Sequence, residues 1–324
     1  MDFVEPSLVR QEMNRLGRAG RPFLFLVDFE LTKALLVEDP ERQSAIHYQI
    51  WGRGNKKAGP PPRLEGAHFA ARPLSLAEYA PRFQTVMAGL ARGDSYLVNL
   101  TVATPLETSL GLEEIFAASS ALYQLYVPGH FACFSPERFV RAHEGLISTC
   151  PMKGTINADI PNAEKVILED FKETAEHATI VDLLRNDLSL SAQEVRVSRY
   201  RYIDRIRSRQ REILQVSSEI IGRLPPDYPS QLGDIIFKML PAGSCSGAPK
   251  AKTLEIIRRA EPGPRGFYTG VFGVFDGQSL DSGVLIRFIE RTESGLVFRS
   301  GGGITAYSDL ASEYQEVLEK IYYA

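Results

Sequence analysis

A run of five consecutive apolar residues, Phe23–Val27, constrains the fold most strongly. No polar residue alternates with the apolar ones, so the run predicts a strand that is buried on both faces. Such a strand lies inside the protein, with other layers of structure on either side. The chain has 324 residues, 44% hydrophobic and 24% charged, which is typical of a globular protein with a large core.

Helical and strand patterns continue along the whole chain. Ser75 and Glu78 form a capping box ahead of apolar residues at helical spacing, and Gly93 is expected to end that helix. Further helices are expected at 112–123, 163–185, 230–240, from 249 and after 309, and strands at 96–102, 131–134, 146–149, 195–211, 213–221, 267–275, 283–289 and 296–299. No internal repeat and no clear linker is evident, which favours a single domain.

Composition excludes several classes of function. The net charge of −3 gives no overall attraction to nucleic acid or to anionic membranes. The segment Val195–Arg211 contains seven arginines, which raises the question of an acidic partner, but its alternation predicts a strand with one solvated face. No apolar run approaches the roughly 20 residues of a membrane span. Three cysteines without C-x-x-C spacing favour reduced thiols, and we therefore expect a cytoplasmic protein.

The segment Cys150–Thr155 is a candidate site. It follows an expected strand and contains Pro151, which cannot donate a backbone hydrogen bond, and Lys153 beside a glycine, where a ligand can approach the backbone closely. Taken alone, the same residues also fit a surface corner with a solvated lysine.

Two expected helices carry paired carboxylates. Glu173 and Glu176 lie on one helical face with His177, and Glu313 and Glu316 share a face with Lys320. Four carboxylates from two helices suit a hard divalent cation such as Mg²⁺, although solvated helix faces explain such pairs as well. The glycine triplet in Ser300–Ile304 is expected to follow a strand and to present bare backbone N–H groups to a carboxylate. The glycine-rich segment Pro241–Lys250 lacks the spacing of a P-loop.

Six motifs in a fixed order resemble those of the chorismate-utilising enzymes, from about residue 70 to the end. They are Pro151-Met-Lys-Gly-Thr155, Lys172-Glu-x-x-Glu-His177, Val181-Asp-Leu-Leu-Arg-Asn-Asp187, Ser246-Gly-Ala-Pro-Lys250, Ser300-Gly-Gly-Gly-Ile304 and Glu313-Tyr-Gln-Glu316. The resemblance implies an α/β (α+β) fold in which two central, mostly antiparallel β-sheets pack as a sandwich with helices outside. It also implies one chorismate-binding domain over 1–324, with a shortened N-terminal part at 1–70 and a catalytic core at 71–324.

The resemblance further implies the roles of individual residues. Glu173, Glu176, Glu313 and Glu316 would hold Mg²⁺, and Glu137 would be the general acid at the departing ring hydroxyl. The substrate-binding positions would be Thr155, His177, Tyr268, Arg287, Gly302, Gly303 and Lys320.

Lys153 decides between members of the family. Aminodeoxychorismate synthases carry lysine here, whereas anthranilate synthases have Pro-Ile-Ala-Gly-Thr at this motif. The implied reaction is amination of chorismate with ammonia through a covalent Lys153 intermediate, giving 4-amino-4-deoxychorismate on the way to p-aminobenzoate and folate. Leu97 stands where water-adding members carry lysine and most amine-adding members carry glutamine, and leucine cannot activate water, so isochorismate and salicylate synthesis are disfavoured. Anthranilate synthase component I and a non-catalytic chorismate-binding paralogue remain as alternatives.

A separate partner is also expected. None of the three cysteines lies in the Gly-x-Cys-x-Gly elbow of a glutaminase, so ammonia would come from solution or from a glutamine amidotransferase subunit in a heterodimer. The chain lacks the first part of full-size relatives, which in anthranilate synthases helps to form the tryptophan feedback site. We therefore expect that tryptophan does not inhibit this protein.

Overall fold

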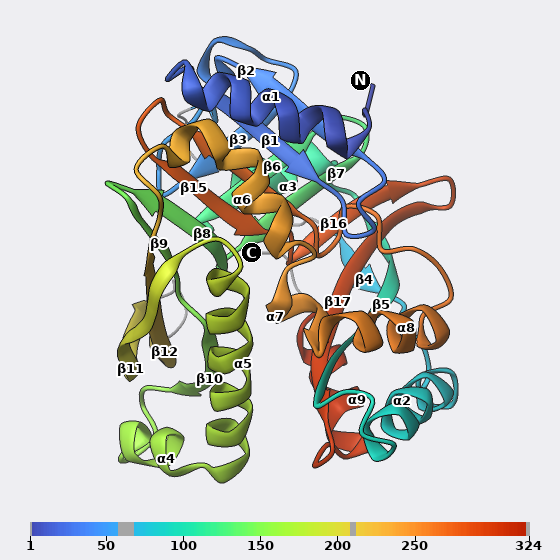
Figure 1. Cartoon of the computed structure of the whole chain (residues 1–324). Coiled ribbons are helices and arrows are strands. Elements are labelled where there is room, and N and C mark those ends of the chain that lie inside the picture. Colours follow the sequence, from blue (N-terminus) through green and yellow to red (C-terminus); the bar gives the residue numbers. More distant parts are fainter. Residues whose placement is uncertain (1, 58–67, 208–211, 322–324) are drawn as a thin grey trace.

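Two antiparallel sheets with helices around them make up the computed structural model, which describes residues 2–57, 68–207 and 212–321 (Figure 1). The larger sheet has the order β10-β12-β9-β8-β15-β14-β1-β2, with β11 paired to β12, and the smaller has the order β13-β5-β17-β16-β7-β6-β3, with β4 paired to β5. The fold class expected from the sequence is confirmed.

The strands of the larger sheet are β1 (Phe23–Val27), β2 (Ala34–Glu38), β8 (Arg138–His143), β9 (Leu146–Thr149), β10 (Met152–Asn157), β11 (Gln193–Arg207), β12 (Glu212–Arg223), β14 (Val271–Phe275) and β15 (Leu280–Val284). Those of the smaller sheet are β3 (His47–Ile50), β4 (Phe69–Ala71), β5 (Leu97–Thr108), β6 (Tyr123–Val127), β7 (Phe131–Ser135), β13 (Gly247–Ala248), β16 (Phe288–Thr292) and β17 (Gly295–Thr305). The helices are α1 (Pro6–Arg18), α2 (Leu76–Ala91), α3 (Leu112–Ala118), α4 (Ala163–Glu169), α5 (Phe171–Ser189), α6 (Leu232–Met239), α7 (Gly243–Ser246), α8 (Lys250–Ala260) and α9 (Leu310–Glu319), with 3-10 turns at η1 (Pro40–Arg42) and η2 (Tyr228–Gln231).

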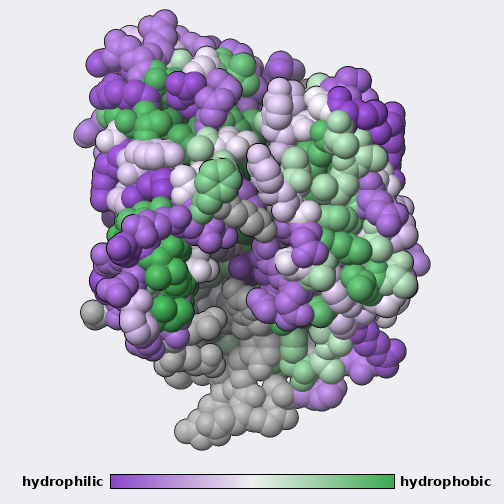
Figure 2. All heavy atoms as spheres, turned by 90° about the horizontal axis from the view of Figure 1, so that it is seen from below, coloured by the Kyte–Doolittle hydropathy of each residue, from purple (hydrophilic) through white to green (hydrophobic). Residues whose placement is uncertain are grey.

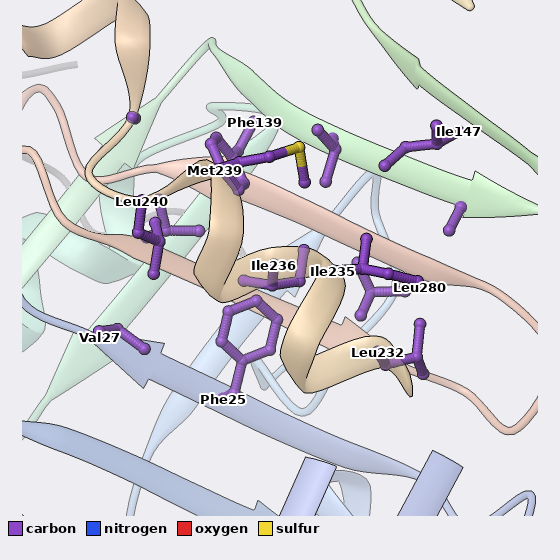
Figure 3. Close-up of a cluster of buried hydrophobic side chains, with 14 of the residues drawn as sticks. Phe25, Val27, Phe139, Ile147, Leu232, Ile235, Ile236, Met239, Leu240 and Leu280 are labelled. Atoms are coloured by element: carbon purple, nitrogen blue, oxygen red, sulfur yellow. The ribbon is translucent and has the colours of Figure 1, made fainter. Parts of the chain in front are cut away.

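Strand β1 is buried on both faces, as its uninterrupted apolar run predicts. Leu24 and Leu26 belong to the cluster that joins the two sheets, while Phe25 and its neighbours on the other face pack under α6. Figure 3 shows Phe25 and Val27 beneath the apolar face of α6. Each such side chain contributes about 1.5–3 kcal/mol by leaving water, so the two layers are held together through β1.

The expected helix at 163–185 is wrong in one respect, because it is two helices. Asp170 separates α4 from α5, and its carboxylate accepts a hydrogen bond of 2.8 Å from the backbone N–H of Glu173. This N-cap starts a new helix at Phe171 and ends the preceding one. The new helix carries Glu173 and Glu176.

Other predicted elements also have different limits, among them the strand expected at 267–275, which begins only at Val271. The helix expected to reach residue 123 ends at Ala118, because Tyr123 begins the fully buried strand β6. The strand expected at 283–289 is the end of β15 and the start of β16, which lie in different sheets, with Arg287 at φ 54° between them. The arginine-rich strand is β11, and residues 208–211 of that prediction lie outside the described part.

The glycine triplet does not follow a strand but lies inside β17. Gly301, Gly302 and Gly303 pair with residues 101, 100 and 99 of β5, whereas the pairing of β17 with β16 reaches only to Arg299. On that side the triplet therefore extends beyond its neighbouring strand, and the expected access to its backbone comes from this edge rather than from a loop.

Helices α5 and α9 stand on opposite sides of the molecule's lower end, α5 beside β10 and α9 beside β17 (Figure 1). Seen from that end, hydrophilic residues gather on the surface between the two sides (Figure 2). Residues up to 71 contribute strands to both sheets, and α1 packs on α6.

Candidate active site

A bulge in β10 presents Lys153. The register between β10 and β12 shifts between Met152 and Thr155, and Gly154 has a φ of 88°, a conformation that glycine adopts without strain. The Nζ atom of Lys153 lies 2.7 Å from Oε2 of Glu176, whose side chain is only 4% exposed. The lysine expected to be a nucleophile is thus held against one of the expected metal ligands.

Helix α5 supplies the first pair of carboxylates. Glu173 and Glu176 are one turn apart, and Oε2 of Glu173 is buried and accepts no hydrogen bond from the described residues. A Cβ atom added to Gly154 would lie 3.1 Å from that oxygen, so the bulge and the carboxylate fit closely only with glycine at 154.

Helix α9 supplies the second pair. Glu313 is 2% exposed, and Oε1 of Glu316 lies 2.6 Å from Nζ of Lys320, which also donates to the carbonyl of Gly301 over 2.8 Å. A Cβ atom on Gly302 would lie 3.6 Å from Oε1 of Glu316 and 3.8 Å from Oε2 of Glu313. The glycine triplet of β17 and the carboxylates of Glu313 and Glu316 therefore face each other.

The charged groups of β10 and α5 and those of α9 affect one another's pKa values. Burial lowers the pKa of Lys153, but the carboxylates of Glu176, Glu316 and Glu173 outweigh it and raise the pKa above its usual value. Burial is also the main effect at Lys320 and lowers its pKa, with Lys153 adding to the decrease. Burial raises the pKa of Glu173. Lys153 therefore lies within the electrostatic field of glutamates from both helices.

Glu137 follows β7, and its Oε1 accepts a short hydrogen bond from the hydroxyl of Ser244 on α7. Burial raises the pKa of Glu137, while the Ser244 hydrogen bond and the charge of Arg287 offset part of the increase. A carboxyl group whose pKa is raised keeps its proton nearer to neutral pH, which is what a general acid requires.

The remaining expected substrate positions differ in their surroundings. Tyr268 is buried, and its ring lies 5.9 Å from that of Phe288. Thr155 is exposed, two residues beyond Lys153 on β10. The imidazole of His177 is fully buried and bonds the Ser218 hydroxyl over 2.6 Å, so it faces β12 and not open surface.

Gly303 and Leu97 lie next to each other across the β5–β17 pair. A Cβ atom on Gly303 would be 3.1 Å from Cδ1 of Leu97, whose side chain is 4% exposed. An apolar surface thus lies beside the glycine strand.

Sequence reasoning missed Ser244 and Arg265. Ser244 lies in the glycine-rich segment that was compared only with a P-loop, and its partner Glu137 is 107 residues away in the chain. Arg265 is 1% exposed and donates to the carbonyls of Cys245 and Asn99 over 2.7 and 2.6 Å. An isolated serine or arginine in the sequence carries no signal for such distant contacts.

The four glutamates suit a hard divalent cation, because their ligand atoms are carboxylate oxygens. One of these atoms, Oε2 of Glu173, is buried and accepts no hydrogen bond from the described residues. In the described parts of the chain, no three His, Cys, Asp or Glu side chains are already arranged around a common metal position. Lysine ammonium groups instead lie against Glu176 and Glu316. The residues fit a cation chemically, and binding would require these ion pairs to rearrange.

Two surface cavities, of about 620 and 530 Å³, lie beside α4 and beside the end of β5, and neither is lined by an expected site residue. Among the described residues, no helix is both long and apolar enough to cross a membrane.

Comparison with known proteins shows the class to which this fold and its glutamate pairs belong. The chain belongs to the chorismate binding enzyme family, whose model matches residues 22–323. It is 47% identical over 313 residues to an uncharacterized PabA-like protein of Haemophilus influenzae, covering 96% of this chain and 95% of that one.

Similarity to functionally named relatives is lower. The chain is 32% identical over 265 residues to aminodeoxychorismate synthase component 1 of Salmonella typhimurium, covering 76% of this chain and 57% of that protein. The solved structure of anthranilate synthase component I from Streptococcus pneumoniae matches with a TM-score of 0.65 and 27% identity, covering 78% of this chain and 58% of that chain. The chain thus spans little more than half the length of these relatives.

Proposed function

We propose that the protein aminates chorismate with ammonia to give 4-amino-4-deoxychorismate, in an Mg²⁺-dependent reaction through a covalent bond to Lys153. The observation that carries the proposal is the position of Lys153, 2.7 Å from Glu176 and within the field of glutamates from both α5 and α9. The similarity to an aminodeoxychorismate synthase component 1 supports the same reaction.

Glu173, Glu176, Glu313 and Glu316 would hold the cation. When bound, Mg²⁺ would supply positive charge for the ring carboxylate of chorismate and would offset the carboxylate charge that keeps the proton on Lys153. Lys320 and Arg287 would add cationic partners for carboxylate oxygens, and the bare backbone of Gly302 and Gly303 leaves room for them.

The proposed chemistry has two substitutions. The neutral amine of Lys153 forms a bond to the ring carbon remote from the hydroxyl, the two ring double bonds shift toward the carbon that bears the hydroxyl, and the C–O bond there breaks. The oxygen takes the proton of Glu137 and leaves as water. Ammonia then bonds to the carbon that lost the hydroxyl, the double bonds shift back, and the bond to the Lys153 nitrogen breaks, so that the lysine departs as an amine; the extra proton of the incoming nitrogen returns to Glu137. Leu97, which is buried beside Gly303, would present an apolar side chain that cannot activate water, which disfavours hydroxylation.

Ammonia would reach the site from solution or from a separate glutamine amidotransferase subunit. The latter is supported by the similarity to a component 1 protein, since that name implies a second component. The heterodimer is tested by mixing the purified protein with the cognate amidotransferase; absence of both association and glutamine-dependent activity would contradict it.

Anthranilate synthesis is the second candidate, because an anthranilate synthase component I is among the similar solved structures. One assay separates the two. The protein is incubated with chorismate, Mg²⁺ and ammonium, and the product is identified by mass spectrometry and fluorescence. We expect 4-amino-4-deoxychorismate; anthranilate as the product would contradict the proposal. Binding of chorismate and Mg²⁺ with no turnover would instead indicate a non-catalytic paralogue.

A further inference from the structure

Two sequence motifs that the proposed chemistry leaves unused meet in the structure. Asp187 ends one motif near the C-terminus of α5, and Lys250 ends the other and begins α8. Their Oδ1 and Nζ atoms are 2.9 Å apart, and the side chains are 9% and 22% exposed. The same ammonium group donates to the carbonyl of Met239, 2.8 Å away at the end of α6. One cation therefore joins three helices.

This cation closes the segment between α6 and α8, in which α7 lies. Met239 is the last residue of α6, next to Leu240 in Figure 3, and the C-terminal carbonyls of a helix attract positive charge. Gly243 begins α7 against the other oxygen of Asp187, so closely that a Cβ atom there would lie 2.5 Å from Oδ2. The ion pair thus fixes both the ends of the segment and the first residue of α7.

Helix α7 in turn touches the expected general acid. The hydroxyl of Ser244 donates to Glu137, and the carbonyl of Cys245 accepts a hydrogen bond from Arg265 over 2.7 Å. A continuous set of contacts therefore runs from α5, which carries the first glutamate pair, through Asp187 and α7 to Glu137.

We propose that the Asp187–Lys250 pair is a positioning device that holds Ser244 of α7 against Glu137. The inference rests on the proposed function only for the role of Glu137. Neither member of the pair touches the reacting atoms, so both act through α7. A pair that served stability alone would, when broken, weaken the whole fold and not α7 in particular.

The three cysteines distinguish these outcomes without any assay of activity. Cys245 lies on α7 and is 4% exposed, so its alkylation requires α7 to open. Cys133 lies in β7 and is fully buried, so its alkylation reports unfolding of the smaller sheet. Cys150 is partly exposed and shows that the reagent is active.

The experiment measures N-ethylmaleimide labelling of each cysteine by peptide mass spectrometry, in the wild type and in Lys250→Met. Because breaking a buried ion pair leaves a carboxylate uncompensated, we expect Cys245 to label at least about tenfold faster while Cys133 stays protected. Asp187→Asn, which keeps the side-chain shape, should act likewise and serves if Lys250→Met does not fold. Lys252→Met is the matched control, since Lys252 is exposed on the same helix and pairs only with Glu255 in the described structure.

Equal acceleration of Cys133 and Cys245 would overturn the proposal, and so would unchanged labelling of Cys245. In amination assays, Lys250→Met should lower kcat by roughly 10- to 100-fold with little change in KM, as should Ser244→Ala. The variant that combines Lys250→Met with Ser244→Ala should have the same kcat as Ser244→Ala alone, because the Asp187–Lys250 pair acts through the Ser244 hydroxyl. A kcat lowered by the product of the two single effects would contradict this. If the wild type forms no product, the proposed function fails, and labelling alone decides the role of the pair.

Discussion

Replacing Arg265 by methionine should destabilise the protein by about 4 kcal/mol. Arg265 and Glu261 are 1% and 4% exposed and are joined by hydrogen bonds of 2.6 and 2.9 Å, while the guanidinium lies 4.4 Å from the ring centre of Phe29. Methionine keeps the volume but leaves the Glu261 carboxylate buried, and loss of one member of a buried ion pair costs about 3–5 kcal/mol. The two carbonyls that lose their donor add to this cost, and the apolar replacement offsets part of it.

Urea unfolding followed by circular dichroism measures this effect. With a slope of about 3 kcal/mol per M, the midpoint should fall by more than 1 M. Arg92→Met is the control, because Arg92 forms an exposed pair with Asp94, whose loss costs about 0–1 kcal/mol. Equal midpoints for the two variants would show that burial does not strengthen the Arg265 contacts.

Three further predictions concern the site. Gly154→Ala should lower the stability by roughly 1–2 kcal/mol and should also lower kcat, because residue 154 has a φ of 88° and a Cβ atom there would press on Glu173. Urea unfolding measures the first effect and amination assays the second. Unchanged values would contradict the bulge geometry. Burial lowers the pKa of His177 to about 4 in the folded state, below its value in the unfolded chain. The neutral imidazole therefore contributes stability that is lost as pH falls from about 6.5 to 4. NMR titration of His177 should give the low midpoint, and a midpoint near 6.5 would contradict this prediction. Gly302→Ala should fold normally, since the nearest atoms to the new Cβ atom would be 3.6–3.8 Å away. The Cβ atom should nevertheless narrow the space in front of Glu316 and so raise KM for chorismate. An unchanged KM would mean that the substrate binds elsewhere.

Local patterns predicted much of the fold. The apolar run of β1 gave a strand buried on both faces, and the capping box at Ser75 and Glu78 is present at the start of α2. The pattern of α4 and α5 was continuous, but the cap at Asp170 divided it, because a single side chain can outweigh helical periodicity. Arg287 was expected inside a continuous strand at 283–289, because no local pattern shows that the chain crosses from one sheet to the other at this residue.

The candidate site shows the same division. Spacing alone placed Glu173 with Glu176 and Glu313 with Glu316, because residues three apart share a helical face. The chemistry of four carboxylates on two helices already suggested one divalent cation between the pairs, and the resemblance implied the same set of ligands. The contacts of Ser244 with Glu137 and of Asp187 with Lys250 join residues 107 and 63 positions apart, and no local pattern encodes such pairs.

Capture of the proposed lysine adduct is the direct test of covalent catalysis by Lys153. The protein is mixed with chorismate and Mg²⁺ without ammonium, quenched, and mapped by peptide mass spectrometry. We predict that Lys153 gains the mass of chorismate less one water and that ammonium removes the adduct. Lys153→Ala should abolish both adduct and amination, whereas Lys165→Ala, at an exposed position on α4, should retain both. Amination by Lys153→Ala at the wild-type rate would exclude a covalent role for Lys153.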